Sequence, residues 1–166
     1  MIKKFLLFAI VALPATIFAQ EGRIAHLNHL EVITAMPEFK LMQDSLQKSA
    51  EIFDRELQQL QENYTQKANE YFAQRDTLHE SIKVRKEQEL QSLQQNAQNY
   101  QQYAQEKQQE LEQTLSTPVL DKFQKAVDDV AKENNFLFIL NSAALYYSAP
   151  NAPNATPMVK KKLGLQ

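Results

Sequence analysis

The chain has 166 residues, of which 43% are hydrophobic, with only 2 Gly and 6 Pro and with neither Cys nor Trp. Gln, Glu, Lys, Leu and Ala fill its middle, which is typical of long helices or coiled coils rather than of a β-sandwich or a doubly wound sheet. The formal net charge of −2 is unlike that of a nucleic-acid-binding domain, which carries a dense basic face. We therefore expect no nucleic-acid partner.

The N-terminus has the pattern of a secretory signal peptide. Lys3 and Lys4 precede an apolar run from Phe5 to Leu13, and the small residue Ala19 lies before Gln20. We predict a signal peptide over residues 1–19 that is cleaved after Ala19. A retained anchor is the alternative, but the run is shorter than a membrane span needs. Removal of Lys3 and Lys4 leaves the mature chain with a formal charge of −4 and no cysteine for a disulfide.

Residues 38–115 contain no Pro and no Gly, and they predict a helical arm. Apolar residues recur at spacings of three and four, which is the seam of a coiled coil. In the first half the seam consists of Leu46, Ala50, Phe53, Leu57, Leu60, Tyr64, Ala68 and Tyr71; in the second it consists of Leu90, Leu93, Ala97, Tyr100, Ala104, Leu111 and Leu115.

The two halves lose phase near residues 73–80, where we expect the tip of a hairpin. Thr77 and Glu80 are three residues apart, as in a capping box, and predict the start of a second helix. Two antiparallel arms of about 37 residues would each reach about 55 Å. A single uninterrupted helix is the alternative, because no Gly or Pro enforces the break.

Residues 20–37 and 116–166 predict a β-containing body. Thr117-Pro118 predicts a kink or a helix restart, followed by a helix with one apolar face that ends at Asn134-Asn135. We expect three short strands, at Arg23 to Asn28, in "FLFIL" and in "AALYY", and a last helix that starts at Thr156-Pro157 and ends near Gly164. The apolar face of the helix that follows Pro118 consists of Leu120, Phe123, Val127 and Val130.

This layout resembles the Skp/OmpH family of periplasmic chaperones. The resemblance is most specific in "PVLDKFQKAVDDVAKENNFLFILNSAALYY" and "TPMVKKKLG", and "RIAHLNHLEVITAMPEFK" supports it. The fold class it implies is mainly α with a small β part: a long antiparallel coiled-coil hairpin, or tentacle, projects from a small β-strand body that closes by trimerisation.

The resemblance also implies a function. It implies a homotrimeric, ATP-independent periplasmic holdase that binds unfolded outer-membrane β-barrel proteins in a cavity between its arms and prevents their aggregation. The family has no catalytic residues, so we expect no enzyme activity and no cofactor. Known members are strongly basic, whereas this mature chain is acidic, which puts charge-driven capture of clients in doubt.

The aromatic residues of the arm are the candidate client-binding residues, because loose apolar contacts can hold an unfolded chain without ordering it. Phe72 and Tyr103 each neighbour a seam residue, so we expect them off the buried stripe. At the tip, Lys83, Arg85 and Lys86 form a candidate basic patch for anionic lipid headgroups. The client-binding candidates are Phe53, Tyr64, Phe72 and Tyr103.

The sequence lacks the motifs of metal-binding and catalytic sites. His26 and His29 are three residues apart, but too few further ligands gather near them for a structural zinc site, so we predict no metal. Phosphate loops, nucleophile elbows and Cys–His pairs are missing. The competing hypothesis is a secreted coiled-coil structural or adaptor protein, which would use the same heptads without holding clients.

Overall fold

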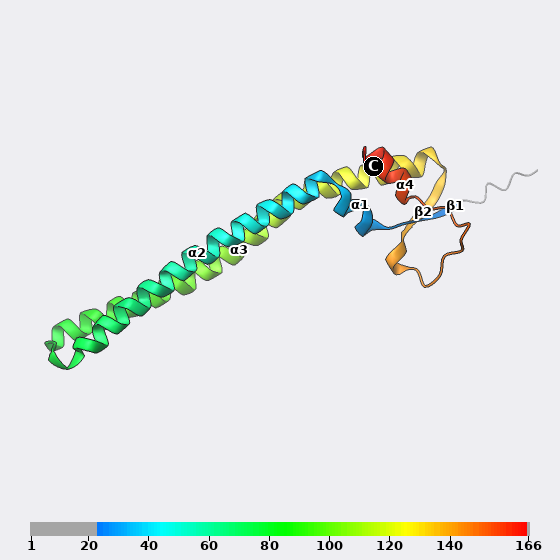
Figure 1. The fold of residues 1–166 in the computed structure, drawn as a ribbon. Helices are drawn as coiled ribbons and strands as arrows, with labels where there is room; N and C mark the ends of the chain where they lie inside the picture. The colour runs from blue at the N-terminus through cyan, green and yellow to red at the C-terminus, as the bar shows by residue number, and fades with distance from the viewer. Residues whose placement is uncertain (1–22, 166) are drawn as a thin grey trace, which may run out of the picture.

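The computed structural model describes residues 23–165, and the predicted signal peptide lies outside these residues. A long helical hairpin projects from a small body that contains both ends of the described chain (Figure 1). The mainly helical class with a small β part is confirmed. Among residues 23–165 no helix combines the length and the apolar character needed to cross a membrane.

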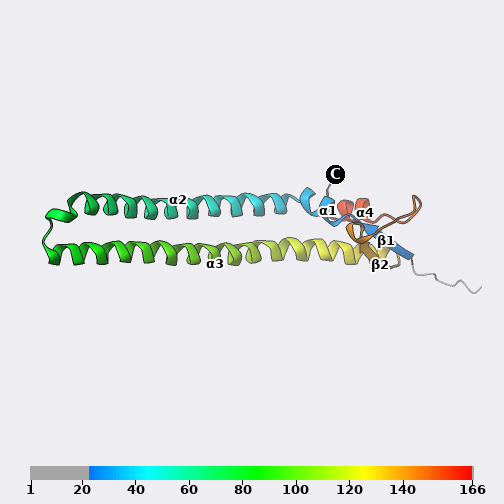
Figure 2. The same cartoon turned by 90° about the horizontal axis from the view of Figure 1, so that it is seen from below.

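The hairpin consists of α2 (Pro37–Gln74) and α3 (Glu80–Glu133). The two helices run antiparallel and lie side by side along the whole arm (Figure 2). At 1.5 Å per residue, the 38 residues of α2 extend about 57 Å. The single uninterrupted helix is therefore excluded, and the apolar seam packs one arm helix against the other.

The turn at the tip differs from the predicted capping box. Residues Arg75–Thr77 form a 3₁₀ turn, and the Thr77 hydroxyl donates a hydrogen bond to the Gln74 carbonyl at 2.8 Å. Thr77 therefore caps the end of α2 and does not start α3. The N-cap of α3 is His79, whose ring nitrogen accepts a hydrogen bond from the Ser81 N–H.

Pro118 does not restart a helix, because α3 continues through it to Glu133. The Thr114 carbonyl loses its usual partner, but Pro118 lies on an exposed face where water can satisfy that carbonyl. The opposite face packs on the body and holds the helix together there. The residues that α3 buries in the body are Val119, Phe123, Ala126 and Val130; Leu120, expected on this face, is exposed.

The body contains a two-stranded parallel sheet of β1 (Arg23–Leu27) and β2 (Phe136–Asn141). The first strand therefore pairs with a strand that follows the whole arm in the sequence. Asn135 precedes β2 with a φ of 53°, the left-handed conformation expected after α3.

The third predicted strand, "AALYY", does not form. The Asn141 side chain accepts a hydrogen bond from the Ala143 N–H at 3.1 Å, and this contact turns the chain into a 3₁₀ helix, η2 (Ser142–Ala144). A segment further on takes the place beside β1: the His26 N–H donates to the Pro153 carbonyl, and the Ala155 N–H donates to the His26 carbonyl.

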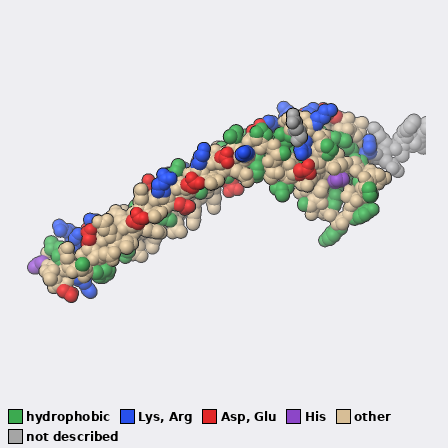
Figure 3. Space-filling model, in the orientation of Figure 1, with side chains coloured by type: hydrophobic (Ala, Val, Ile, Leu, Met, Phe, Trp, Pro, Cys, Tyr) green, Lys and Arg blue, Asp and Glu red, His purple; other side chains and the backbone are tan. Residues whose placement is uncertain are grey.

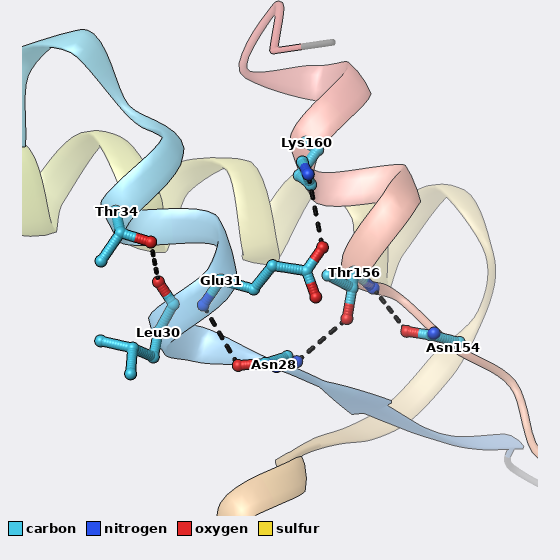
Figure 4. A network of polar contacts seen from close by, with 7 residues as sticks. All are labelled: Asn28, Leu30, Glu31, Thr34, Asn154, Thr156 and Lys160. Atoms are coloured by element: carbon cyan, nitrogen blue, oxygen red, sulfur yellow. Dashed lines mark hydrogen bonds and ion pairs between the residues drawn. The ribbon is translucent and has the colours of Figure 1, made fainter.

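Two short helices complete the body, α1 (His29–Ala35) and α4 (Thr156–Lys162). The Asn28 side chain caps α1 by accepting from the Glu31 N–H, and the Asn28 N–H donates to the Thr156 hydroxyl at 3.0 Å (Figure 4). Lys160 of α4 reaches Glu31 at 3.3 Å. These polar contacts join the two chain ends over a core that includes Val32, Met36 and Val159.

Candidate functional site

The predicted aromatic residues fall into two groups on the arm. Phe53 of α2 lies 6.3 Å from both Tyr100 and Tyr103 of α3, measured between ring centroids. Tyr100 and Tyr103 are 6.1 Å apart. We call these three residues the mid-arm cluster. Phe53 and Tyr100 are half-buried in the seam, whereas 50% of Tyr103 is exposed.

The second group lies toward the tip, and we call Tyr64, Tyr71 and Phe72 the tip group. All three line one shallow hollow of about 330 Å³, together with residues of α3 that include Leu90 and Gln94. Tyr71 is only 3% exposed, whereas Phe72 beside it is 64% exposed. The structure thus brings Phe53 together with Tyr103 and Tyr64 together with Phe72, but it keeps the two pairs apart along the arm.

Tyr71 is fixed across the hairpin by a carboxylate. Its hydroxyl donates a hydrogen bond to the Glu87 carboxylate of α3 at 2.5 Å. This hydrogen bond raises the pKa of Tyr71, because the carboxylate stabilises the neutral phenol. Tyr71 is therefore buried in the hairpin and joins its two helices. Phe72 is the aromatic residue of the tip group that is exposed to a partner.

A second hollow opens beside the mid-arm cluster. Its volume is about 240 Å³, and it forms where the small residues Ala50 and Ala104 face each other across the seam. Phe53 and Leu57 provide its apolar wall, and Gln101 and Gln105 its polar wall. Neither hollow is a closed pocket of the kind that orients a small substrate; each is an open surface that suits a flexible chain.

The basic tip residues stand among carboxylates. Lys83 lies 3.5 Å from Glu80, and Lys86 lies 3.8 Å from Glu89. Basic and acidic side chains are interspersed along the visible face of the arm (Figure 3). Arg85 is exposed at the start of α3. Because acids lie beside Lys83 and Lys86, the electrostatic attraction between this patch and an anionic surface is weaker than three basic residues alone would give.

No functional residue was predicted from the sequence on one exposed apolar surface of the body. Leu137, Phe138, Tyr146 and Tyr147 are exposed on β2 and on the segment after it. Hydrophobic side chains gather at this end of the body (Figure 3). The signal was visible in the sequence, because no charged residue lies between Glu133 and Lys160. For the described residues, no group of three or more His, Cys, Asp or Glu side chains could hold a metal ion.

Comparison with known proteins agrees with this architecture. The sequence model of a family described as "Outer membrane protein (OmpH-like)" matches residues 23–163. The crystal structure of an OmpH-like protein from Caulobacter crescentus CB15, described as a candidate outer membrane chaperone, superimposes with a TM-score of 0.74 at 15% identity. It matches over 86% of this chain and 83% of that one, which shows a shared fold.

A comparison with curated proteins finds no match. The family match alone covers nearly all of the described residues, from the first residue of β1 to the residue after α4. It includes the body as well as the arm, and so it does not rest on coiled-coil composition. The chain therefore belongs to the OmpH-like outer membrane protein family.

Proposed function

We propose that this protein is an ATP-independent holdase of the periplasm, which binds unfolded outer-membrane β-barrel proteins between the arms of a homotrimer. The observation that carries the proposal is the exposure of Phe72 and Tyr103 on an arm about 57 Å long. Membership of the OmpH-like family and the fold shared with the Caulobacter protein support it.

The surface of the arm suits loose holding. Between Glu89 and Glu106, α3 contains only uncharged residues; Gln is the most frequent, with interspersed apolar and aromatic side chains. A client segment can exchange among such contacts without adopting one conformation, so it loses little conformational entropy. Because each contact is weak, no nucleotide-driven step is needed to release the client.

The homotrimer is part of the proposal because the body is incomplete as a sheet. A two-stranded sheet has little stability alone. Within residues 23–165, no other segment pairs with the second edge of β2. Association of three copies would cover this edge and the exposed apolar residues around it, and would place three arms around a common space.

The test is an aggregation assay on the mature chain, Gln20 to Gln166. A urea-unfolded outer-membrane β-barrel protein is diluted into it while light scattering and the mass of the complex are recorded. We expect suppression at about one trimer per client. The double substitution Phe72→Ser with Tyr103→Ser should at least halve the suppression, because it removes the two most exposed aromatic contacts of the arm.

A matched control changes the neighbouring residues Ala73 and Gln102 to Ser, which are exposed on the same helices. This control should suppress aggregation as well as the wild-type chain. If the wild-type chain is trimeric but leaves aggregation unchanged, the holdase function is wrong and the structural or adaptor function takes its place. If the double variant acts like the wild-type chain, the two aromatic residues are not the client-binding site.

A further inference from the structure

One face of the two-stranded sheet is apolar but has a single ionisable side chain. The register places Ile24 opposite Phe138 and His26 opposite Leu140. Because side chains alternate along a strand, these four residues share one face, which we call the outer sheet face. Ile24, Phe138 and Leu140 are 52%, 59% and 41% exposed. The opposite face, with Ala25 and Leu27, is buried in the core.

The surroundings of His26 contain no carboxylate. Nδ1 of its ring lies 3.1 Å from the Ser142 hydroxyl. The elements packed against it are β2, η2 and residues 153–155, and none of these contains a charged residue. The charged residue of its own strand is Arg23, which lies over the Phe136 ring. The other titratable side chains of this region are the phenols of Tyr146 and Tyr147.

His29, the other histidine of the body, has a different setting. Its ring packs edge-on against Phe123 with 4.8 Å between the centroids. It starts α1, whereas His26 lies in β1 on the outer sheet face. The body therefore contains two histidines, of which one faces the apolar surface that the isolated chain leaves uncovered.

We infer that a second copy of this chain covers the outer sheet face, and that protonation of His26 opposes this contact. The inference rests on the proposed homotrimer and adds the way in which its assembly is regulated. The occupant is a second copy because the uncharged stretch between Glu133 and Lys160 recurs in every copy. Two such apolar surfaces can cover each other, whereas a charged partner would find nothing there to pair with.

The direction of the pH effect follows from the cost of burying charge. A neutral imidazole can be buried while it keeps the Ser142 contact, but an imidazolium buried among apolar groups has no anion to offset its lost hydration. Histidine ordinarily changes charge between about pH 5 and pH 8. Acid therefore weakens association: for a histidine with the ordinary pKa of about 6.5 that must be neutral in the contact, the loss at about pH 6 is about fourfold per histidine, or about 70-fold for a trimer.

The experiment is sedimentation of the mature chain at fixed protein and salt concentration between about pH 8 and about pH 6, a range in which exposed carboxylates stay ionised. The wild-type chain should pass from trimer toward monomer on acidification. His26→Ile, which keeps a β-branched apolar residue in the strand, should stay assembled. The control His29→Gln should dissociate like the wild-type chain, and His26→Lys should be monomeric throughout.

Circular dichroism of each sample shows whether the helices remain folded, which separates dissociation from unfolding. A wild-type association constant that does not fall between about pH 8 and about pH 6, or a His26→Ile chain that dissociates like the wild-type chain, overturns the inference and leaves the holdase proposal standing. A wild-type chain that is monomeric at about pH 8 overturns both.

Discussion

Glu38 is a single residue that ties the arm to the body end of α3. It lies in the first turn of α2 and accepts a hydrogen bond from Lys122. This hydrogen bond, together with the N–H of its own backbone, lowers the pKa of the Glu38 carboxyl. The side chains of Lys122 and Glu38 are 47% and 38% exposed, so solvent screens much of their attraction.

The lowered pKa of Glu38 determines how its contribution to the free energy of unfolding changes with pH. A carboxyl with a lower pKa in the folded state stabilises the fold above its unfolded pKa, and this contribution is lost as the pH falls through the folded pKa. Glu38→Gln should lower the free energy of unfolding at pH 7 by about 0.5 kcal/mol. The difference from the wild-type chain should vanish between about pH 5 and about pH 3.

Urea unfolding at several pH values and one protein concentration measures this difference. Glu112→Gln is the matched control, because Glu112 is an exposed carboxylate elsewhere on α3, and it should leave the stability unchanged at each pH. A difference for Glu38→Gln that persists at about pH 3 would contradict the assigned ion pair.

Gln108 places an amide in the apolar seam, so its replacement should change the free energy of unfolding. Its Nε2 donates to the Leu46 carbonyl at 3.1 Å, while its Oε1 is buried without a hydrogen-bond partner. Replacing a buried unsatisfied polar group by an apolar one of similar size removes its desolvation penalty. Gln108→Leu should therefore raise the free energy of unfolding by about 1 kcal/mol.

Chemical denaturation followed by helix content tests this gain. Gln105→Leu serves for comparison, because Gln105 is exposed on the same helix, and it should change the stability little. A loss of stability in Gln108→Leu would mean that the hydrogen bond to α2 outweighs the unpaired oxygen.

At the scale of the element, α3 belongs to two structures at once. Its first part forms the arm with α2, and its last part covers the body with Val119 and Phe123. Pro118 stands directly before this second part, and the Thr117 hydroxyl donates to the Gln113 carbonyl at 2.8 Å in the turn before it. The helix thus continues through a residue that usually interrupts one, because packing on its inner face holds both sides in line.

Pro118→Ala should restore the missing hydrogen bond to the Thr114 carbonyl. Proline costs about 3 kcal/mol in a helix interior, but part of this cost is offset here, so the free energy of unfolding should rise by about 1 kcal/mol. Urea unfolding checks the change, with exposed Gln124→Ala on the same helix as the control. A fall in stability would show that the body requires the helix geometry imposed by the proline.

The elements that the sequence predicted are those governed by local rules. The seam spacing predicted two packed arm helices, and the pair Asn134-Asn135 was correctly predicted to end α3, with Asn135 in the left-handed conformation. The strand at "AALYY" was wrong, because a strand needs a partner edge and the Asn141 side chain turns the chain before one is met. The capping box was wrong because a hydroxyl at 77 can equally bond backward to Gln74.

The candidate site was predictable in composition but not in layout. Spacing placed Phe72 and Tyr103 beside seam positions, and both are indeed largely exposed. The pairing of Phe53 with Tyr100 and Tyr103 depends on the stagger between α2 and α3, which the spacing within each helix does not determine. Their role in binding stays a prediction until the substitutions are tested.

At the scale of the whole molecule, the charge of the chain would contribute little to the proposed capture of a client. Without the predicted signal peptide, residues 20–166 have a formal charge of −4, and acidic and basic side chains are interspersed along the visible face of the arm (Figure 3). An apolar contact does not weaken with ionic strength, whereas attraction between exposed charges is screened within about 10 Å at 0.1 M salt.

Client capture should therefore depend weakly on salt. Between about 0.05 M and about 0.5 M NaCl we expect the concentration needed for half-maximal suppression of scattering to change by less than about threefold. Light scattering during client dilution measures it, with a strongly basic chaperone as the comparison. A loss of suppression by tenfold or more at the higher salt would show that charged residues, such as those at the tip, hold the client.

The pairing of β1 with β2 makes the whole arm an insertion between two neighbouring strands of the body. Because the seam repeats every seven residues, deletion of one heptad from α2 and of the facing heptad from α3 would keep the register. Each paired deletion would shorten the reach by about 10 Å and leave the body contacts unchanged. Arm length and body contacts can therefore vary independently, so in the proposed trimer the volume enclosed between the arms could change without a new subunit interface.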